Sequence, residues 1–243
     1  MKGNELKYFL GCSGWYYKDW AGRFYPEDLA KKKWLQFYST HFNTVEINNT
    51  FYRFPTEKQL ENWFNRTPSD FVFTLKANRL ITHRKKFQGT KDLVDRFYRL
   101  TDVLKEKLGC ILFQLPPMLH KDLELLNRII EQLDLRRNNV LEFRHESWFD
   151  EEVYMVLRKN SVGFCSVSAP NLPQDLVATS RNAYVRFHGT NESMYTHLYS
   201  QVELEDWGRR IRKLAADKVF CYFNNDYQAN AVTNCLQLKE ILG

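Results

Sequence analysis

The chain has 243 residues, of which 44% are hydrophobic, 15% aromatic and 26% charged, with 10 Gly and 7 Pro. This composition excludes a disordered or fibrous chain and predicts one compact domain over residues 1–243. Lys and Arg number 35 and Asp and Glu 29, so the net charge is +6, which favours an anionic partner.

No run of about eighteen apolar residues is present, so we expect no membrane partner. The N-terminal sequence MKGNELKYFLGCSGW lacks an apolar signal core, which predicts a cytoplasmic protein. The 5 cysteines are odd in number and form no Cys-x-x-Cys pair, which argues against a disulfide framework and a thiolate zinc site.

Short apolar runs alternate along the chain with longer segments of helical periodicity. This alternation predicts parallel strands linked by helices. The predicted strands are Tyr8–Ser13, Thr44–Asn48, Phe71–Lys76, Cys110–Gln114, Val140–Arg144, Gly163–Val167, Ala183–His188 and Val219–Asn224. The predicted helices are Lys32–His41, Glu57–Asn65, Leu93–Leu108, Leu123–Leu133, Glu151–Asn160, Leu204–Ala216 and Ala231–Leu242. Thr56 and Gln59 predict a capping box at the second helix.

The segment Ser168–Asn182 has no helical pattern, because it carries Pro170 and Pro173. Eight strand units in a chain of this length predict an α/β fold, a single TIM-type (β/α)8 barrel with the sixth helix short or missing. An open doubly wound sheet is disfavoured, since no G-x-G-x-x-G or Walker A sequence occurs.

Strand residues alternate between the helix-covered face and the barrel interior, which can be polar only near its carboxyl-end mouth. Apolar residues such as Leu141 and Phe143 should face the helices, and the polar residues between them should face inward. The inward polar set at the mouth is Glu46, Asn48, Thr74, Lys76, Gln114, Glu142, Arg144, Arg186, His188 and Asn224. Its three cations and two carboxylates favour a neutral or anionic ligand; a buried ion-pair network is the structural alternative.

A basic loop follows the third predicted strand. The window Lys76–Lys91 holds six Lys and Arg and no acid, which equals the net charge of the whole chain. The loop leaves a strand at the mouth, so its charges are placed to attract phosphate or another polyanion, although solvated surface charge is the alternative. The residues predicted to contact nucleic acid or a polyanion are Arg79, His83, Arg84, Lys85 and Lys86.

Aromatic residues follow the first two predicted strands and include Trp15, Tyr17 and Tyr52. They suit either stacking on bases or sugar rings or a hydrophobic lid over the mouth. The loop beginning Asn224-Asn225-Asp226, after the last strand, offers amides where barrels often bind phosphate.

Seven ordered motifs resemble the domain of unknown function 72 family, the YecE-like proteins: GCSGWYYKDWAGRFYP, FNTVEINNTFYRFPT, FTLKANRLITH, ILFQLPP, LEFRHESWF, YVRFHG and YFNND. The resemblance covers nearly the entire chain. It implies a TIM-type barrel and no established activity. The motif residues include most of the inward polar set.

Three functions are compatible with these residues. The leading hypothesis is a metal-independent enzyme in which Glu46, Glu142 and His188 are catalytic. The ligand-binding residues would be Asn48, Tyr52, Lys76, Gln114, Arg144, Arg186, Asn224 and Asn225. Its ligand would be a phosphate- or carboxylate-bearing small molecule or a nucleotide, and its reaction phosphodiester cleavage or a sugar-phosphate lyase or isomerase step.

The second hypothesis is a non-catalytic nucleic-acid-binding protein that uses the basic loop and the mouth aromatics. The third is a glycosidase with Glu46 and Glu142 as paired carboxylates. No cofactor motif is present, and the few candidate metal ligands lie among Lys and Arg, so we expect no cofactor and no metal.

Overall fold

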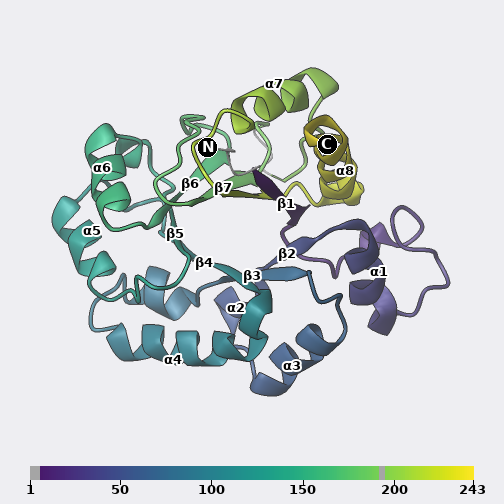
Figure 1. Ribbon diagram of the computed structural model, residues 1–243, viewed down its shortest axis with the longest axis horizontal. Helices are drawn as coiled ribbons and strands as arrows, with labels where there is room; N and C mark the ends of the chain where they lie inside the picture. The colour runs from purple at the N-terminus through teal and green to yellow at the C-terminus, as the bar shows by residue number, and fades with distance from the viewer. Residues whose placement is uncertain (1–5, 192–194) are drawn as a thin grey trace, which may run out of the picture.

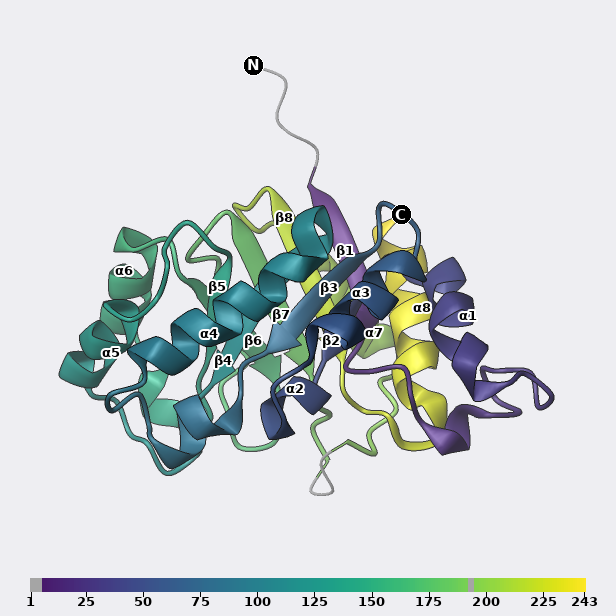
Figure 2. The ribbon, with the colours of Figure 1, turned by 90° about the horizontal axis from the view of Figure 1, so that it is seen from below.

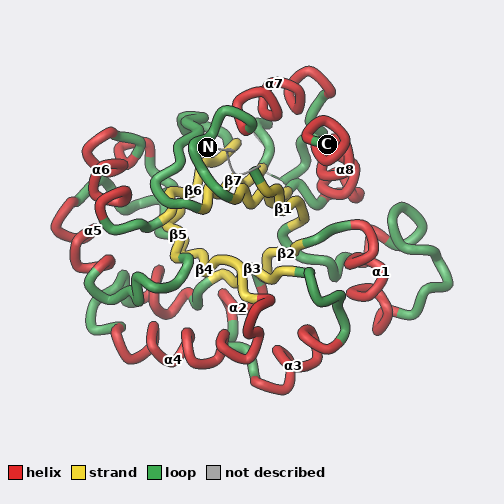
Figure 3. The backbone as a smooth tube through the Cα atoms, viewed as in Figure 1, coloured by secondary structure: helices red, strands yellow, loops and turns green. Residues whose placement is uncertain are grey.

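A computed structural model describes residues 6–191 and 195–243. Eight parallel strands form one sheet in the order β1-β8-β7-β6-β5-β4-β3-β2, which curves into a barrel with helices outside it (Figures 1 and 3). The strands are β1 Lys7–Cys12, β2 Thr44–Ile47, β3 Val72–Lys76, β4 Leu108–Gln114, β5 Asn139–Glu142, β6 Gly163–Ser168, β7 Asn182–Phe187 and β8 Lys218–Phe223. The α-helices are α1 Trp34–His41, α2 Asn49–Tyr52, α3 Glu57–Asn65, α4 Lys91–Thr101, α5 Leu123–Ile130, α6 Glu151–Lys159, α7 Gln201–Ile211 and α8 Asn230–Leu242.

The predicted barrel is confirmed, and each predicted strand begins and ends within two residues of an observed one. No helix separates β6 from β7, as the proline-containing segment predicts. The Thr56 side chain accepts a hydrogen bond from the Gln59 amide, and the Gln59 side chain accepts one from the Thr56 amide, which completes the predicted capping box. No helix in the described part of the chain is long and apolar enough to cross a membrane.

Several local predictions differ from the structure. The helix predicted over Leu204–Ala216 runs from Gln201 to Ile211 as α7, and the helix predicted to end at Leu133 ends at Ile130 as α5. The predicted helix Leu93–Leu108 is wrong in its second half, because α4 ends at Thr101 and a 3-10 turn, Asp102–Lys107, leads into β4. Lys105 takes a positive φ of 45° there, which ends the helical path that its apolar periodicity suggested. The short helix α2, which directly follows β2, has no predicted counterpart because four residues are too few for helical periodicity.

Side chains close the seam between β1 and β2, which share no hydrogen-bonded ladder among the described residues. Asn43 accepts a hydrogen bond from the Leu10 amide at 3.0 Å and donates one to the Tyr8 carbonyl at 2.9 Å. The Tyr38 hydroxyl accepts from the Cys12 amide at 2.7 Å and donates to the Thr44 carbonyl at 3.0 Å.

Gly11 allows the two strands of the seam to approach this closely. A Cβ atom added to Gly11 would lie 2.1 Å from the Thr44 carbonyl oxygen. Any side chain at this position would therefore force β1 away from β2.

We expect Tyr38→Phe to lower the free energy of unfolding by about 1–3 kcal/mol, because it leaves a buried N–H and a buried carbonyl without partners. Urea denaturation measures the change. Tyr16→Phe removes a hydroxyl from a ring that is 57% exposed and should change stability little. Equal stability of the two variants would show that the seam does not depend on this hydroxyl.

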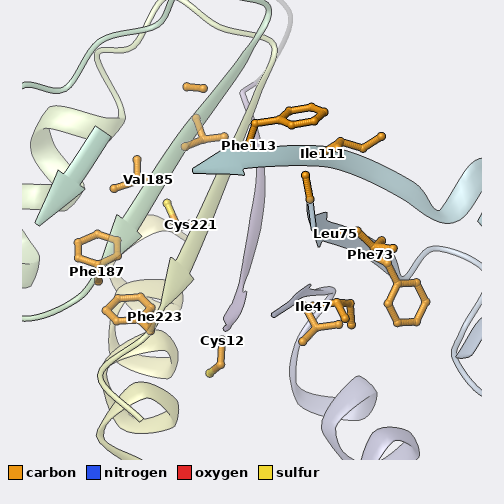
Figure 4. Close-up of a cluster of buried hydrophobic side chains, with 14 of the residues drawn as sticks. Cys12, Ile47, Phe73, Leu75, Ile111, Phe113, Val185, Phe187, Cys221 and Phe223 are labelled. Atoms are coloured by element: carbon orange, nitrogen blue, oxygen red, sulfur yellow. The ribbon is translucent and has the colours of Figure 1, made fainter. Parts of the chain in front are cut away.

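Alternation along the strands separates two buried layers, as predicted. Apolar residues that face the helices include Val185, Phe187 and Phe223 (Figure 4). A second cluster fills the barrel interior and includes Phe9, Leu112 and Phe220. Toward the carboxyl ends of the strands, the residues that face the barrel interior change from apolar to polar. These strand ends lie at the lower edge of Figure 2, beside α2.

Candidate active site at the barrel mouth

A buried arginine joins the two carboxylates of the mouth. Arg186 extends from β7 and is 1% exposed. Its Nη2 donates to Glu46 Oε1 at 2.6 Å, and its Nη1 donates to Glu142 Oε2 at 2.7 Å. One guanidinium therefore binds carboxylates from opposite parts of the barrel, strands β2 and β5.

Glu142 receives further donors. Arg144 Nη1 donates to Glu142 Oε1 at 2.9 Å. Burial alone would raise the pKa of Glu142, but the charges of Arg186 and Arg144 and the hydrogen bond from His188 outweigh it and hold the pKa well below its usual range. Glu142 is therefore ionised at neutral pH.

His188 is neutral and fully buried beside Glu142. Burial and the Arg186 charge lower the pKa of His188 to about 3. His188 Nε2 lies 3.2 Å from Glu142 Oε1, and since a carboxylate only accepts, Nε2 carries the proton. His188 Nδ1 then accepts from Asn224 Nδ2 at 3.1 Å. Both ring nitrogens are engaged, which favours a positioning role over a proton shuttle.

Glu46 has a second partner in Tyr184, whose hydroxyl donates to Glu46 Oε2 at 2.5 Å. Burial and the Glu46 charge raise the pKa of Tyr184 well above its usual value, so the phenol stays protonated. Tyr184 lies two residues before Arg186 on β7 and therefore faces the same side of the strand. Sequence reasoning missed Tyr184 because an aromatic residue in an apolar strand indicates core packing.

Lys76 is the one cation of the predicted mouth that forms no ion pair with an acidic side chain among the described residues. Its Nζ donates to Gln114 Oε1 and lies 4.4 Å from the centroid of the Phe51 ring. Burial and the nearby Arg186 charge lower the pKa of Lys76 to about 8. The ammonium group therefore remains charged at neutral pH and loses its charge above pH 8.

A cavity of about 300 Å³ lies over this network. Its lining residues are Tyr17, Asn48, Phe51, Tyr52, Lys76, Gln114, Arg144, Arg186, Tyr195, Asn224 and Asp226. Glu46 and Glu142 are 0% exposed and lie outside this lining. A ligand in the cavity would thus meet three cations, while the two carboxylates hold Arg186 and Arg144 from behind.

Two buried polar atoms of the lining residues have no hydrogen-bond partner among the described residues: Arg186 Nε and Asn48 Oδ1. Such groups cost free energy when unpaired, so they tend to mark places where a ligand binds. One is a charged donor and the other an acceptor.

Asp226 is a cavity residue that was not among the predicted site residues. Burial and the nearby Asp19 carboxyl raise the pKa of Asp226 to about 6. A carboxyl group that titrates close to neutral pH suits a general acid or base. Its place directly after the Asn224-Asn225 pair was the available signal, but Asp at that position also reads as a helix cap.

The remaining predicted site residues do not line the mouth cavity. Asn225 is fully buried and donates to the His197 carbonyl and to Asn234, away from the cavity lining. Arg79 and Arg84 line a second cleft beside the mouth, whereas Lys85 and Lys86 line neither cavity. His83 packs edge-on against Phe51, and burial together with the Lys76 charge lowers the pKa of His83 to about 4, so it is uncharged at neutral pH.

No group of three or more His, Cys, Asp or Glu side chains able to hold a metal ion occurs within residues 6–191 and 195–243. The mouth carboxylates Glu46 and Glu142 already accept hydrogen bonds from arginines. This donor set does not fit a divalent cation.

Comparison with known proteins identifies the family of this barrel. The sequence profile of the family described as "Protein of unknown function DUF72" matches residues 9–243. The chain belongs to this family. Among relatives, the UPF0759 protein YunF of Bacillus subtilis (strain 168) is 30% identical, with 96% of this chain and 94% of YunF covered. The UPF0759 protein YecE of Escherichia coli (strain K12) is 25% identical, with 70% and 72% covered.

The crystal structure of a DUF72 family protein, TM1631 from Thermotoga maritima MSB8, superposes with a TM-score of 0.88. It is 31% identical and is matched over 97% of this chain and 99% of its own. DUF72 membership and this similarity both agree with the barrel predicted from strand periodicity.

Proposed function

We propose that this DUF72 protein is an enzyme that binds the phosphate or carboxylate group of a small or nucleotide-like ligand in the mouth cavity. The observation that carries the proposal is the layering of charge: Lys76, Arg144 and Arg186 line the cavity, and the carboxylates that pair with the two arginines are buried beneath it. Cations held in a partly desolvated cavity bind an anion more strongly than exposed cations do.

Lys76 and Arg144 bind the anionic group, and Arg186 Nε supplies a further donor. Asn48 and Gln114 lie beside them in the lining and orient the ligand through their amides. Tyr52 is 66% exposed, so its ring is free to pack against an uncharged part of the ligand.

Asp226 acts as the general acid or base. It lies in the cavity lining, and its raised pKa lets it take up and release a proton near neutral pH. Glu46, Glu142 and His188 act as positioning residues, because they contact Arg186 and Arg144 and do not reach the lining. The proposed chemistry uses side chains of this chain alone, without a metal.

The glycosidase hypothesis has less support. A glycosidase of this kind needs one protonated carboxyl and one ionised carboxylate on opposite sides of a glycosidic bond. Glu142 is held ionised, and neither Glu46 nor Glu142 is exposed to the cavity.

Anion binding at the mouth is tested by calorimetric titration with sulfate, whose charge is constant between pH 5 and 9. Lys76→Met should weaken sulfate binding by about tenfold or more, because it removes a charge-assisted contact while keeping the side-chain volume. In the wild-type protein, binding should weaken as the pH rises through 8, where Lys76 loses its proton, and the variant should lack this dependence.

Lys91→Met is the matched control. It removes the same charge from the same basic window, but Lys91 forms an ion pair with Asp95 and lies outside the mouth. Sulfate affinity that is equal in Lys76→Met and wild type would contradict the proposed function.

A further inference from the structure

A second and larger cleft adjoins the mouth cavity. It has a volume of about 480 Å³, and it is lined by the segment after α2 and by the loop that follows β3. Four of its lining residues are arginines, Arg53, Arg79, Arg84 and Arg96, and none is acidic. The basic loop contributes two of these four, while Arg53 and Arg96 come from elsewhere in the chain and were not predicted as site residues.

These arginines lack acidic partners. None of the four forms an ion pair or donates a side-chain hydrogen bond within the part of the chain that the structure describes. By contrast, Arg186 and Arg144 in the mouth each bind a carboxylate. Four like charges gathered in one cleft repel one another, and an anion in the cleft would relieve that repulsion.

Two of the four guanidinium groups form cation–π contacts with aromatic rings. Arg79 lies over the ring of Tyr52, with 5.5 Å between the guanidinium carbon and the ring centroid, and Arg96 lies over Phe54 at 5.0 Å. Stacking restricts the guanidinium plane but leaves its N–H groups free, which suits the several acceptor oxygens of a phosphate group.

The cleft and the mouth cavity share one lining residue, Tyr52. We propose that the four-arginine cleft is a second phosphate subsite, and that the ligand of this protein carries two phosphate groups, one on either side of the Tyr52 ring. This inference rests on the proposed binding of an anionic group in the mouth. The part of the ligand between the two phosphates packs on Tyr52, as a nucleoside does on an exposed aromatic ring.

The test compares adenosine 5′-monophosphate with adenosine 3′,5′-bisphosphate by calorimetry. The wild-type protein should bind the bisphosphate at least about tenfold more tightly, because the second phosphate adds charge-assisted hydrogen bonds. The double variant Arg84→Gln/Arg96→Gln should lose this advantage and keep its affinity for the monophosphate. Arg99→Gln, an exposed charge on the same helix as Arg96 but outside the cleft, should behave as wild type.

The two proposals fail in different ways. Bisphosphate affinity that the double variant leaves unchanged overturns the second subsite, even where monophosphate binding is intact. Monophosphate affinity that Lys76→Met leaves unchanged overturns the mouth site instead.

Single-stranded tetrathymidylate distinguishes the two sources of paired phosphates. Tight binding whose salt dependence is reduced in Arg84→Gln/Arg96→Gln supports a phosphodiester chain as the ligand. A gain confined to adenosine 3′,5′-bisphosphate supports a bisphosphorylated small molecule.

Discussion

Arg186→Ala is expected to lower the free energy of unfolding by about 3–5 kcal/mol, the largest loss of stability that we predict for this chain. The substitution leaves the carboxyl groups of Glu46 and Glu142 fully buried without the guanidinium that binds both. Tyr184 and Arg144 still donate to one carboxylate each, but neither joins the two. Denaturation in urea at pH 7 measures the loss.

The loss should depend on pH. Without Arg186, burial raises the pKa of Glu142 in the folded state, so the folded variant takes up protons more readily than the unfolded chain. The variant therefore gains stability relative to wild type as the pH falls from 7 toward 4, and the difference between the two proteins narrows. A difference that is constant over this range would contradict the proposed burial of ionised carboxylates.

Two further variants distinguish the loss of this ion-pair network from a general destabilisation of the barrel. Arg209→Ala breaks an exposed ion pair with Asp206 on α7 and should cost less than about 1 kcal/mol. Adding Glu46→Gln to Arg186→Ala removes one of the unpaired buried charges and should recover part of the lost stability. A double variant less stable than Arg186→Ala alone would argue against charge burial as the cause.

Asp226→Asn is expected to lower kcat by about a hundredfold or more on the substrate of this protein. Asparagine keeps the shape of the side chain but cannot exchange a proton. A panel of phosphate monoesters, sugar phosphates and nucleotides, followed by mass spectrometry for loss of the substrate, provides the assay. The wild-type pH–rate profile should contain a step near pH 6, and the variant should lack it.

Binding measurements distinguish chemistry from ligand affinity at this position. Asp226→Asn removes a negative charge from a cavity that otherwise presents cations, so sulfate binding should be unchanged or slightly tighter. Asp92→Asn, at an exposed position in the first turn of α4, is the matched control and should retain full turnover. A full kcat in Asp226→Asn would exclude Asp226 as the general acid or base.

The barrel and most of its mouth follow from period-two alternation in the sequence. Apolar Val45 and Ile47 flank Glu46, and Val185 and Phe187 flank Arg186, so burial of the apolar residues against helices turns the charged ones inward. Each of these assignments needs only neighbouring residues, and for this reason it was readable without the structure.

Local pattern was less informative where a short segment or a long-range contact decides the conformation. The helix α2 and the turn after α4 escaped prediction, because four residues show no period and a single positive φ at Lys105 carries no apolar signal. The seam between β1 and β2 depends on Tyr38 and Asn43, whose side chains replace a backbone ladder.

The sequence by itself determined which side chains enter the barrel, because alternation along a strand assigns every residue to a face. Only the tertiary structure decided which of these side chains line the cavity and which are buried beneath it. Glu46 and Arg186 are 140 positions apart, and their contact places both carboxylates beneath the cations and out of the cavity. The same folding brings Asp226 to the cavity wall near Asp19, where burial and a second carboxyl raise its pKa. Such contacts depend on the distance between side chains in space, which the spacing of residues along the chain does not encode.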